Sequence, residues 1–242
     1  MHEIAESLDS STARTGPTYR FVAVVVRSVA CLLTRRQWQG GHHLPKEGGY
    51  ITAINHNSHV DAIAYGHFQY NNGLPPRFFI KASVFKVPVL GGILRRIGQI
   101  PVERRSHRAA DSLQLAYEAV QRGECVAIYP EGTLTRDPDL WPGQPKTGVA
   151  RLALMSGAPV IPVAQWGDHE MVPPYAKGGR RVRFRPRPTL VVHAGQPVDL
   201  SDLYGAELTA GVLREASTRI MDAIVALLEE IRGEKRPSED GE

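Results

Sequence analysis

The stretch Asn-His-Asn-Ser-His-Val-Asp, residues 55–61, brings together side chains suited to proton transfer. His56 and Asp61 are separated by four residues and follow an apolar run, residues 49–54. A loop leading from a strand into a helix can fold the two side chains together, so that the carboxylate contacts one imidazole nitrogen and the other takes a proton. The spacing therefore indicates a general base oriented by a carboxylate. Because no serine occupies a Gly-x-Ser-x-Gly turn, the hydroxyl to be activated must come from a substrate.

A metal site and a helix cap compete with this interpretation of residues 55–61. A metal site could use His56, His59 and Asp61, but the spacing is wrong and no distant cysteine or histidine cluster completes it, so the sequence predicts no metal. In a purely structural role for the stretch, Asn57 or Ser58 caps the following helix and His56 only hydrogen-bonds the backbone. The residues of this stretch alone leave the structural role open.

Cations and a polar turn follow other predicted strands. The sequence Tyr-Pro-Glu-Gly-Thr, residues 129–133, ends one strand, and Lys81 ends the strand at 76–82. Arg104 closes the segment Gly-Gln-Ile-Pro-Val-Glu-Arg, residues 98–104. Ligands of open α/β sheets bind at the carboxyl ends of strands, and arginine and lysine side chains suit a phosphate group. Lys81 and Arg104 are therefore predicted to contact a phosphate.

Four ordered blocks, at residues 55–61, 98–104, 129–133 and 160–164, resemble those of the glycerophospholipid acyltransferase family, whose best-known members are lysophosphatidic acid acyltransferases. The resemblance covers roughly residues 38–166, and a His-x4-Asp block followed by Pro-Glu-Gly-Thr about 70 residues later is a specific combination. It implies an α/β acyltransferase fold. It also implies transfer of a fatty acyl group from acyl-CoA or acyl carrier protein to a lysophospholipid or glycerol phosphate. Either thioester is a co-substrate, and no cofactor is expected.

The same resemblance implies roles for individual residues. His56 would be the base and Asp61 its partner, and direct attack by the acceptor would need no acyl-enzyme. Contacts with the acceptor phosphate would come from Arg104, Glu131, Gly132 and Thr133, and Ile161 and Pro162 would shape the acyl side. The family usually continues its third block with Arg-Ser, where this chain has Leu134 and Thr135. That departure leaves Arg136 or Lys146 as the substitute cation, and it keeps another lysolipid or a glycolipid open as acceptor. Thioesterase-like hydrolysis of acyl-CoA is a further alternative.

The elements that must position these residues alternate between strands and helices. Strands are predicted at 49–54, 76–82, 160–166 and at the start of 125–133, and helices at 60–70, 106–124, 146–157 and 207–233. A short helix and an edge strand are expected within 87–104, and residues 180–186 and 189–195 alternate like a hairpin. This order predicts a single α/β domain, residues 38–232, with a mixed, mostly central sheet flanked by helices.

The N-terminal region predicts a membrane-associating helix at residues 19–37, between a disordered segment, 1–18, and the domain. Its apolar run, Phe21–Leu33, is 13 residues or roughly 20 Å long, is interrupted by Arg27, and is too short for a hydrocarbon core of ~30 Å. Basic residues flank it, and no acidic residue occurs from Ser10 to Lys46. We therefore expect peripheral or monotopic attachment to an anionic membrane surface at the cytoplasmic face of the cell membrane. A core helix packed on the domain is the alternative.

The composition is that of a globular protein: 242 residues, 42% of them hydrophobic, with a formal charge of +4. Residues 177–188 carry six cations and no acid. This basic segment could contact anionic headgroups or the phosphates of CoA, or simply form a solvated face. A nucleic-acid partner is not expected, because no recognition module is visible. The final residues, 233–242, are predicted to be a disordered tail.

Overall fold

A seven-stranded mixed sheet forms the centre of the computed structural model, which describes residues 16–72, 74–103, 109–175, 183 and 185–237. The strand order is β1-β7-β6-β2-β5-β3-β4, and every pair is parallel except β6 with β7. The central strands are almost fully buried, as expected of a parallel sheet covered on both faces. The strands are β1 (Arg35–Gln39), β2 (Tyr50–Ile54), β3 (Pro76–Lys81), β4 (Ile100–Val102), β5 (Cys125–Ile128), β6 (Val160–Trp166) and β7 (Thr189–Ala194).

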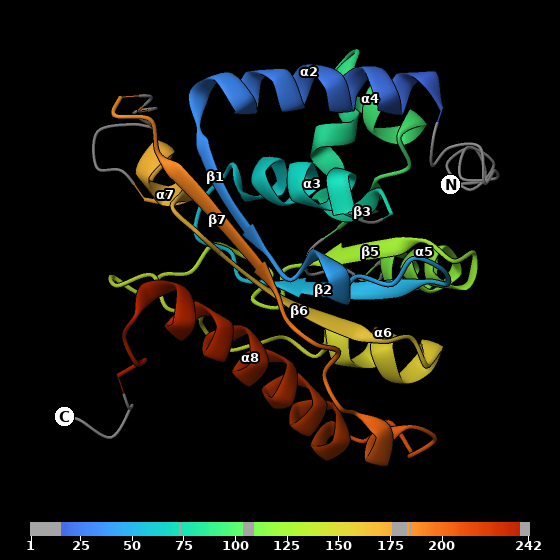
Figure 1. The fold of residues 1–242 in the computed structure, drawn as a ribbon. Coiled ribbons are helices and arrows are strands. Elements are labelled where there is room, and N and C mark those ends of the chain that lie inside the picture. The colour runs from blue at the N-terminus through green and yellow to red at the C-terminus, as the bar shows by residue number, and fades with distance from the viewer. Residues whose placement is uncertain (1–15, 73, 104–108, 176–182, 184, 238–242) are drawn as a thin grey trace.

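Helices cover both faces of this sheet (Figure 1). On one face, α5, α6 and α8 pack on β2, β5 and β6 through the larger hydrophobic cluster. On the other face α3 covers the sheet, and α2 lies across α3 and α4 as an outer layer (Figure 1). The helices are α2 (Pro17–Leu33), α3 (Asp61–Asn72), α4 (Leu90–Arg96), α5 (Ala109–Gln121), α6 (Gly148–Ser156), α7 (Asp168–Met171) and α8 (Ala210–Arg232), with short 3-10 turns at Gly41–His43, Ala82–Lys86 and Ser201–Leu203.

The predicted fold class is confirmed: the chain forms a single α/β domain with a mixed sheet flanked by helices. Strand β6 has the predicted bounds, and the helix expected to end at Gly157 does so, with this glycine in the left-handed conformation at φ 67°. A residue without a Cβ adopts this conformation at little steric cost, which explains the helix stop.

The N-terminal helix ends earlier than expected. Helix α2 stops at Leu33, and residues 35–39 form β1 instead of its last turn. The Arg187 guanidinium donates to the carbonyl oxygens of Cys31 and Thr34 at 2.6 and 3.1 Å, and so satisfies backbone acceptors at the helix end. Within the described residues, no helix has both the length and the apolar character needed to cross a bilayer.

The predicted hairpin of residues 180–186 with 189–195 is wrong. Both edges of β7 are occupied, by β1 in parallel and by β6 in antiparallel pairing. Pro186 and Pro188 lack the backbone N–H that a paired strand needs, so the alternating arginines did not indicate a strand there. Of these residues, 180–182 and 184 lie outside the described part of the chain.

Candidate active site

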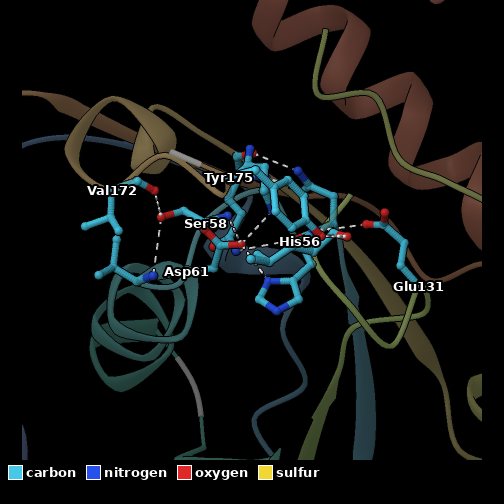
Figure 2. Close-up of polar contacts among 11 residues, drawn as sticks. His56, Ser58, Asp61, Glu131, Val172 and Tyr175 are labelled. Carbon is cyan, nitrogen blue, oxygen red and sulfur yellow. Dashed lines mark hydrogen bonds and ion pairs between the residues drawn. The ribbon is translucent and has the colours of Figure 1, made fainter. Parts of the chain in front are cut away.

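His56 and Asp61 meet at the carboxyl end of β2. His56 lies in the loop after this strand, and Asp61 is the first residue of α3. His56 Nδ1 and Asp61 Oδ2 are 2.9 Å apart, and the side chains are 20% and 0% exposed (Figure 2). The buried carboxylate thus fixes the ring, while part of the imidazole remains accessible. Because Asp61 binds Nδ1, the nitrogen that would exchange a proton with a substrate is Nε2.

Backbone amides hold Asp61 in place. Its Oδ2 also accepts hydrogen bonds from the N–H groups of Asn57 and Ser58, at 2.8 and 2.9 Å. Burial raises the pKa of Asp61 well above its usual range, and the N–H groups of Ser58 and Asn57 oppose the shift. A carboxylate of raised pKa is a stronger acceptor for the imidazole N–H, and it favours the imidazolium that forms during proton transfer.

The loop around His56 is locked to β6 and to the segment after it. Asn55 and Gln165 form a reciprocal pair, with Asn55 Nδ2 donating to Gln165 O at 3.0 Å and Gln165 N donating to Asn55 Oδ1 at 2.8 Å. Asn57 Nδ2 donates to Gln165 O at 3.2 Å, and Ser58 Oγ donates to Val172 O at 2.8 Å (Figure 2). Ser58 Oγ accepts from Val60 N at 3.3 Å, a local contact just before α3, and the His56 ring contacts the Asp61 carboxylate and not only backbone groups.

The Pro-Glu-Gly-Thr turn packs directly against the His56 loop. Glu131 Oε1 accepts from His56 N and Oε2 from Gly143 N, both at 3.0 Å (Figure 2). Thr135 N donates to His56 O at 2.8 Å. Both backbone groups of His56 are therefore held by this region. The arrangement supports a positioning role for Glu131, because both of its oxygens hold backbone N–H groups. Its contact with the acceptor phosphate stays a prediction.

Burial of Glu131 raises its pKa from 4.5 to about 7, and the N–H groups of Gly143 and His56 oppose the shift. Between pH 4.5 and about pH 7, Glu131 keeps its proton in the folded protein but has lost it in the unfolded chain. The free energy of unfolding therefore falls as the pH rises from the lower value to the higher one. The free energy of unfolding of wild type, relative to that of Glu131→Gln, should therefore fall by about 3 kcal/mol between these pH values. Denaturant unfolding at a series of pH values measures it. Glu207→Gln, at an exposed position, should show no such change.

Several residues near His56 were not identified from the sequence. Tyr129 stacks on the His56 ring with centroids 4.1 Å apart and an interplanar angle of 21°, and Phe78 stacks on Tyr129 at 6.4 Å. Asp168 is fully buried, and its two carboxyl oxygens have no hydrogen-bond partner among the described residues. Burial and the nearby Asp61 raise the pKa of Asp168, which favours its neutral form. Tyr129 could have been identified by its position directly before Pro-Glu-Gly-Thr. Asp168 follows a buried strand, and the sequence around it gives no comparable signal.

The residues predicted to bind the acceptor phosphate do not all lie at one place in the structure. Lys146 lies against the turn: its N donates to Pro130 O at 2.9 Å, and a Cβ on Gly132 would come within 2.7 Å of its Nζ. Lys81 is exposed at the end of β3, and Thr133 is exposed in the turn. Arg136 lines a separate cleft. Arg104 lies outside the described residues.

The predicted acyl-side residues lie within β6. Ile161 is buried in the cluster under α3. Pro162 lies on the opposite face, where a Cβ on Gly195 would meet it and Leu227. Successive residues of a strand face opposite sides of a sheet, so Ile161 and Pro162 pack against different helical layers.

An apolar cavity of about 250 Å³ lies between α2, α3, α4 and β3. Ala62 and Ile63, next to Asp61, border it, and so does Phe78 of the aromatic stack. The cavity therefore reaches the residues that follow Asp61 in α3 and extends beneath α2. Its other lining residues are Tyr19, Val22, Ala23, Val26, Arg27, Gly66, His67, Tyr70, Pro76, Ile80, Leu94, Ile97 and Gln99.

Comparisons with known proteins agree with this geometry. A family model described as Acyltransferase matches residues 35–166. A chloroplastic 1-acyl-sn-glycerol-3-phosphate acyltransferase of Brassica napus is 30% identical over 142 residues, which are 58% of this chain and 40% of that protein. The Bacillus subtilis enzyme of the same name is 27% identical over 66% of this chain and 77% of its own length. The chain thus spans less than half of the first relative.

The fold is also found in a solved structure. The crystal structure of the 1-acyl-sn-glycerophosphate acyltransferase of Thermotoga maritima superposes with a TM-score of 0.64 at 22% identity, covering 91% of this chain and 83% of that one. The likeness extends well beyond the segment matched by the family model.

Proposed function

The chain belongs to the acyltransferase family, and from this premise we propose that it moves a fatty acyl group from acyl-CoA or acyl carrier protein to the free hydroxyl of lysophosphatidic acid or a related glycerophosphate acceptor, in phospholipid synthesis. The observation that carries the proposal is the 2.9 Å contact of His56 with buried Asp61, held against the Pro-Glu-Gly-Thr turn. The relatives from Brassica napus and Bacillus subtilis carry the same reaction in their names.

In the proposed reaction His56 Nε2 takes the proton of the acceptor hydroxyl as its oxygen attacks the thioester carbonyl. The tetrahedral intermediate then collapses, the carbon–sulfur bond breaks, and the imidazolium returns the proton to the leaving thiolate. Asp61 stabilises the imidazolium and fixes the tautomer that leaves Nε2 to act as base. The protein itself is not acylated.

The acceptor phosphate is proposed to bind near the Pro-Glu-Gly-Thr turn, at Lys146, Gly132 and Thr133, with Lys81 at the neighbouring strand end. Leu134 is only 6% exposed, so the position where the family has arginine is used here for packing. The Lys146 ammonium against Gly132 supports Lys146, in preference to Arg136, as the substitute cation. Arg104 remains a predicted phosphate ligand.

We place the acyl chain in the apolar cavity under α2, because Ala62 and Ile63, which follow Asp61, border it and most of its lining is hydrocarbon. His67 at its wall need not bring charge, since burial lowers its pKa to about 4, helped by Arg36 and Arg27. Ile161 and Pro162 would then act only through the packing of β6.

Helix α2 is proposed to attach the protein to the cytoplasmic face of the cell membrane, as a peripheral or monotopic contact. Although α2 packs on α3, its outer face keeps large apolar side chains exposed, and those of the segment before α4 are exposed as well. A lipid surface would bury these groups, while flanking arginines meet anionic headgroups. The exposed apolar residues are Phe21, Val24, Val25, Val29 and Leu32 on α2, with Val87, Val89 and Leu90.

Charges on this face should weaken membrane binding. The double variant Phe21→Asp/Leu32→Asp is expected to lose about tenfold or more in affinity for vesicles containing anionic lipid, since two large side chains no longer enter the interface. Co-sedimentation with the vesicles measures this. Met155→Asp changes an exposed apolar residue on α6, away from this face, and should bind as wild type. Equal binding of all three proteins would exclude α2 as the contact.

Mass spectrometry of products tests the proposed function. Purified protein is given mixed acyl-CoAs with lysophosphatidic acid, other lysolipids and a glycolipid. Phosphatidic acid as the main product is expected. A product made from another acceptor would change the assigned acceptor, and free fatty acid alone would favour hydrolysis and contradict acyl transfer.

A further inference from the structure

A second cleft, of about 980 Å³, opens next to the active site and takes no part in the proposed proton transfer. One wall is the segment from Arg136 to Leu140, which follows the Pro-Glu-Gly-Thr turn. A second wall is formed by α7 and the residues that follow it up to Tyr175, and a third by Arg183, Arg185, Pro186 and Pro188. Three separate segments of the chain therefore build this cleft.

The cleft gathers positive charge. The side chains of Arg136, Arg183 and Arg185 all line it, and among the described residues none forms a hydrogen bond or ion pair with them. Of the two carboxylates at its wall, Asp137 already accepts from the N–H of Asp139 at 2.8 Å, and Glu170 is exposed on α7. Guanidinium groups that line one cleft are well suited to phosphate oxygens.

The walls are fixed before any ligand arrives. Arg183 N donates to Met171 O at 2.9 Å, and the Tyr175 hydroxyl donates to Leu134 O at 3.1 Å. Proline, with its restricted φ, contributes five further positions. Tyr175 also offers a flat ring at a position that is 58% exposed. The prolines are Pro138, Pro173, Pro174, Pro186 and Pro188.

This cleft is linked to the base through two short bridges. Thr135, whose N–H donates to His56 O, directly precedes Arg136. Ser58 Oγ donates to Val172 O, and Pro173 of the cleft wall comes next in the chain. These two contacts place two walls of the cleft next to the His56 loop, within the reach of a flexible arm that carries a reactive group.

We propose that this cleft binds the nucleotide end of acyl-CoA, with its diphosphate and 3′-phosphate at Arg136, Arg183 and Arg185 and its adenine against Tyr175 and the prolines. The inference rests on the proposed function and makes acyl-CoA the donor. An acyl carrier protein presents a single phosphate on a convex surface. That phosphate would not fill a recessed site with three arginines. The pantetheine arm would carry the thioester from the cleft to His56.

The test uses adenosine 3′,5′-bisphosphate, which carries two of the three phosphate groups without the thioester. Calorimetric titration should give a Kd about tenfold or more higher for Arg183→Gln/Arg185→Gln than for wild type, because each lost charge-assisted hydrogen bond weakens binding. In transfer assays the same variant should raise the KM for acyl-CoA by a similar factor. It should leave kcat, the KM for lysophosphatidic acid and transfer from acyl-pantetheine unchanged. Arg214→Gln, exposed on α8, is the matched control.

Several outcomes would overturn the inference. Equal affinity of wild type and variant for the bisphosphate is one. A raised KM for lysophosphatidic acid alone is another, since it would assign the cleft to a lipid headgroup. Transfer from acyl carrier protein by a wild type that does not bind the bisphosphate would refute the nucleotide site while acyl transfer stands. Conversely, the wild type could bind the bisphosphate, lose this binding on Arg183→Gln/Arg185→Gln, and yet show no transferase activity. That result would support the site and refute the proposed function.

Discussion

Replacing His56 by alanine should lower kcat for acyl transfer by about 10²–10⁴-fold, because positioned general base catalysis contributes this much. The KM for the acceptor should change little, since the proposed phosphate contacts lie in the turn and not on the imidazole. Steady-state kinetics with acyl-CoA and lysophosphatidic acid measures both constants.

The fold should survive this substitution. The loop is held through the backbone N and O of His56, by Glu131 and Thr135, and alanine keeps both groups. Thermal unfolding of the variant checks this directly. His42→Ala, at an exposed histidine remote from the loop in sequence, should retain wild-type kinetics. Wild-type turnover by a purified, folded His56→Ala protein would refute the assignment of the base.

Changing Asp61 to asparagine should cost about 10³–10⁴-fold in kcat, by analogy with aspartate removal from serine protease triads. Asp61 Oδ2 accepts from the His56 ring and from two backbone amides. An asparagine oxygen in the place of Oδ2 can keep these three contacts, but it carries no negative charge. The imidazolium that forms during proton transfer then loses the charge that stabilises it.

The Asp61→Asn substitution should change the stability of the protein much less than it changes kcat. Burial raises the pKa of Asp61, so the fold bears a cost for its charge, and a neutral amide of the same size removes that cost. We expect the free energy of unfolding of Asp61→Asn to change by no more than about 1–2 kcal/mol. Asp222→Asn on the exposed side of α8 is the control. A folded Asp61→Asn protein with normal kcat would show that the carboxylate has no part in catalysis.

The sequence predicted most of the fold because the central strands are continuous apolar runs and the helices have clear periodicity and glycine stops. Strand β1 was missed because Arg35–Gln39 is polar and mostly exposed, and it joins the sheet only through pairing with β7. That pairing connects residues about 150 positions apart, which no local pattern encodes. The hairpin of residues 180–186 with 189–195 was predicted wrongly for the same reason. An alternating pattern does not show that both edges of β7 pair with other strands, β1 and β6.

The His56–Asp61 contact could be expected from its spacing, whereas the surroundings depend on the tertiary structure. Glu131 was expected at a phosphate, but its oxygens meet two backbone N–H groups that only folding brings together. The same holds for Tyr129 over the imidazole and for Arg232, which lies between Trp141 and Trp166 at 3.9 and 4.4 Å from their centroids. Through this contact the loop before Lys146 is joined to α8.

Thiol release from acyl-CoA, followed with and without lysophosphatidic acid, tests most directly whether His56 activates an acceptor and not water. Wild type should release CoA only when the acceptor is present, in equal amount to the phosphatidic acid formed, and His56→Ala should release almost none. Release at the same rate without acceptor would contradict the account, because the base would then be serving hydrolysis.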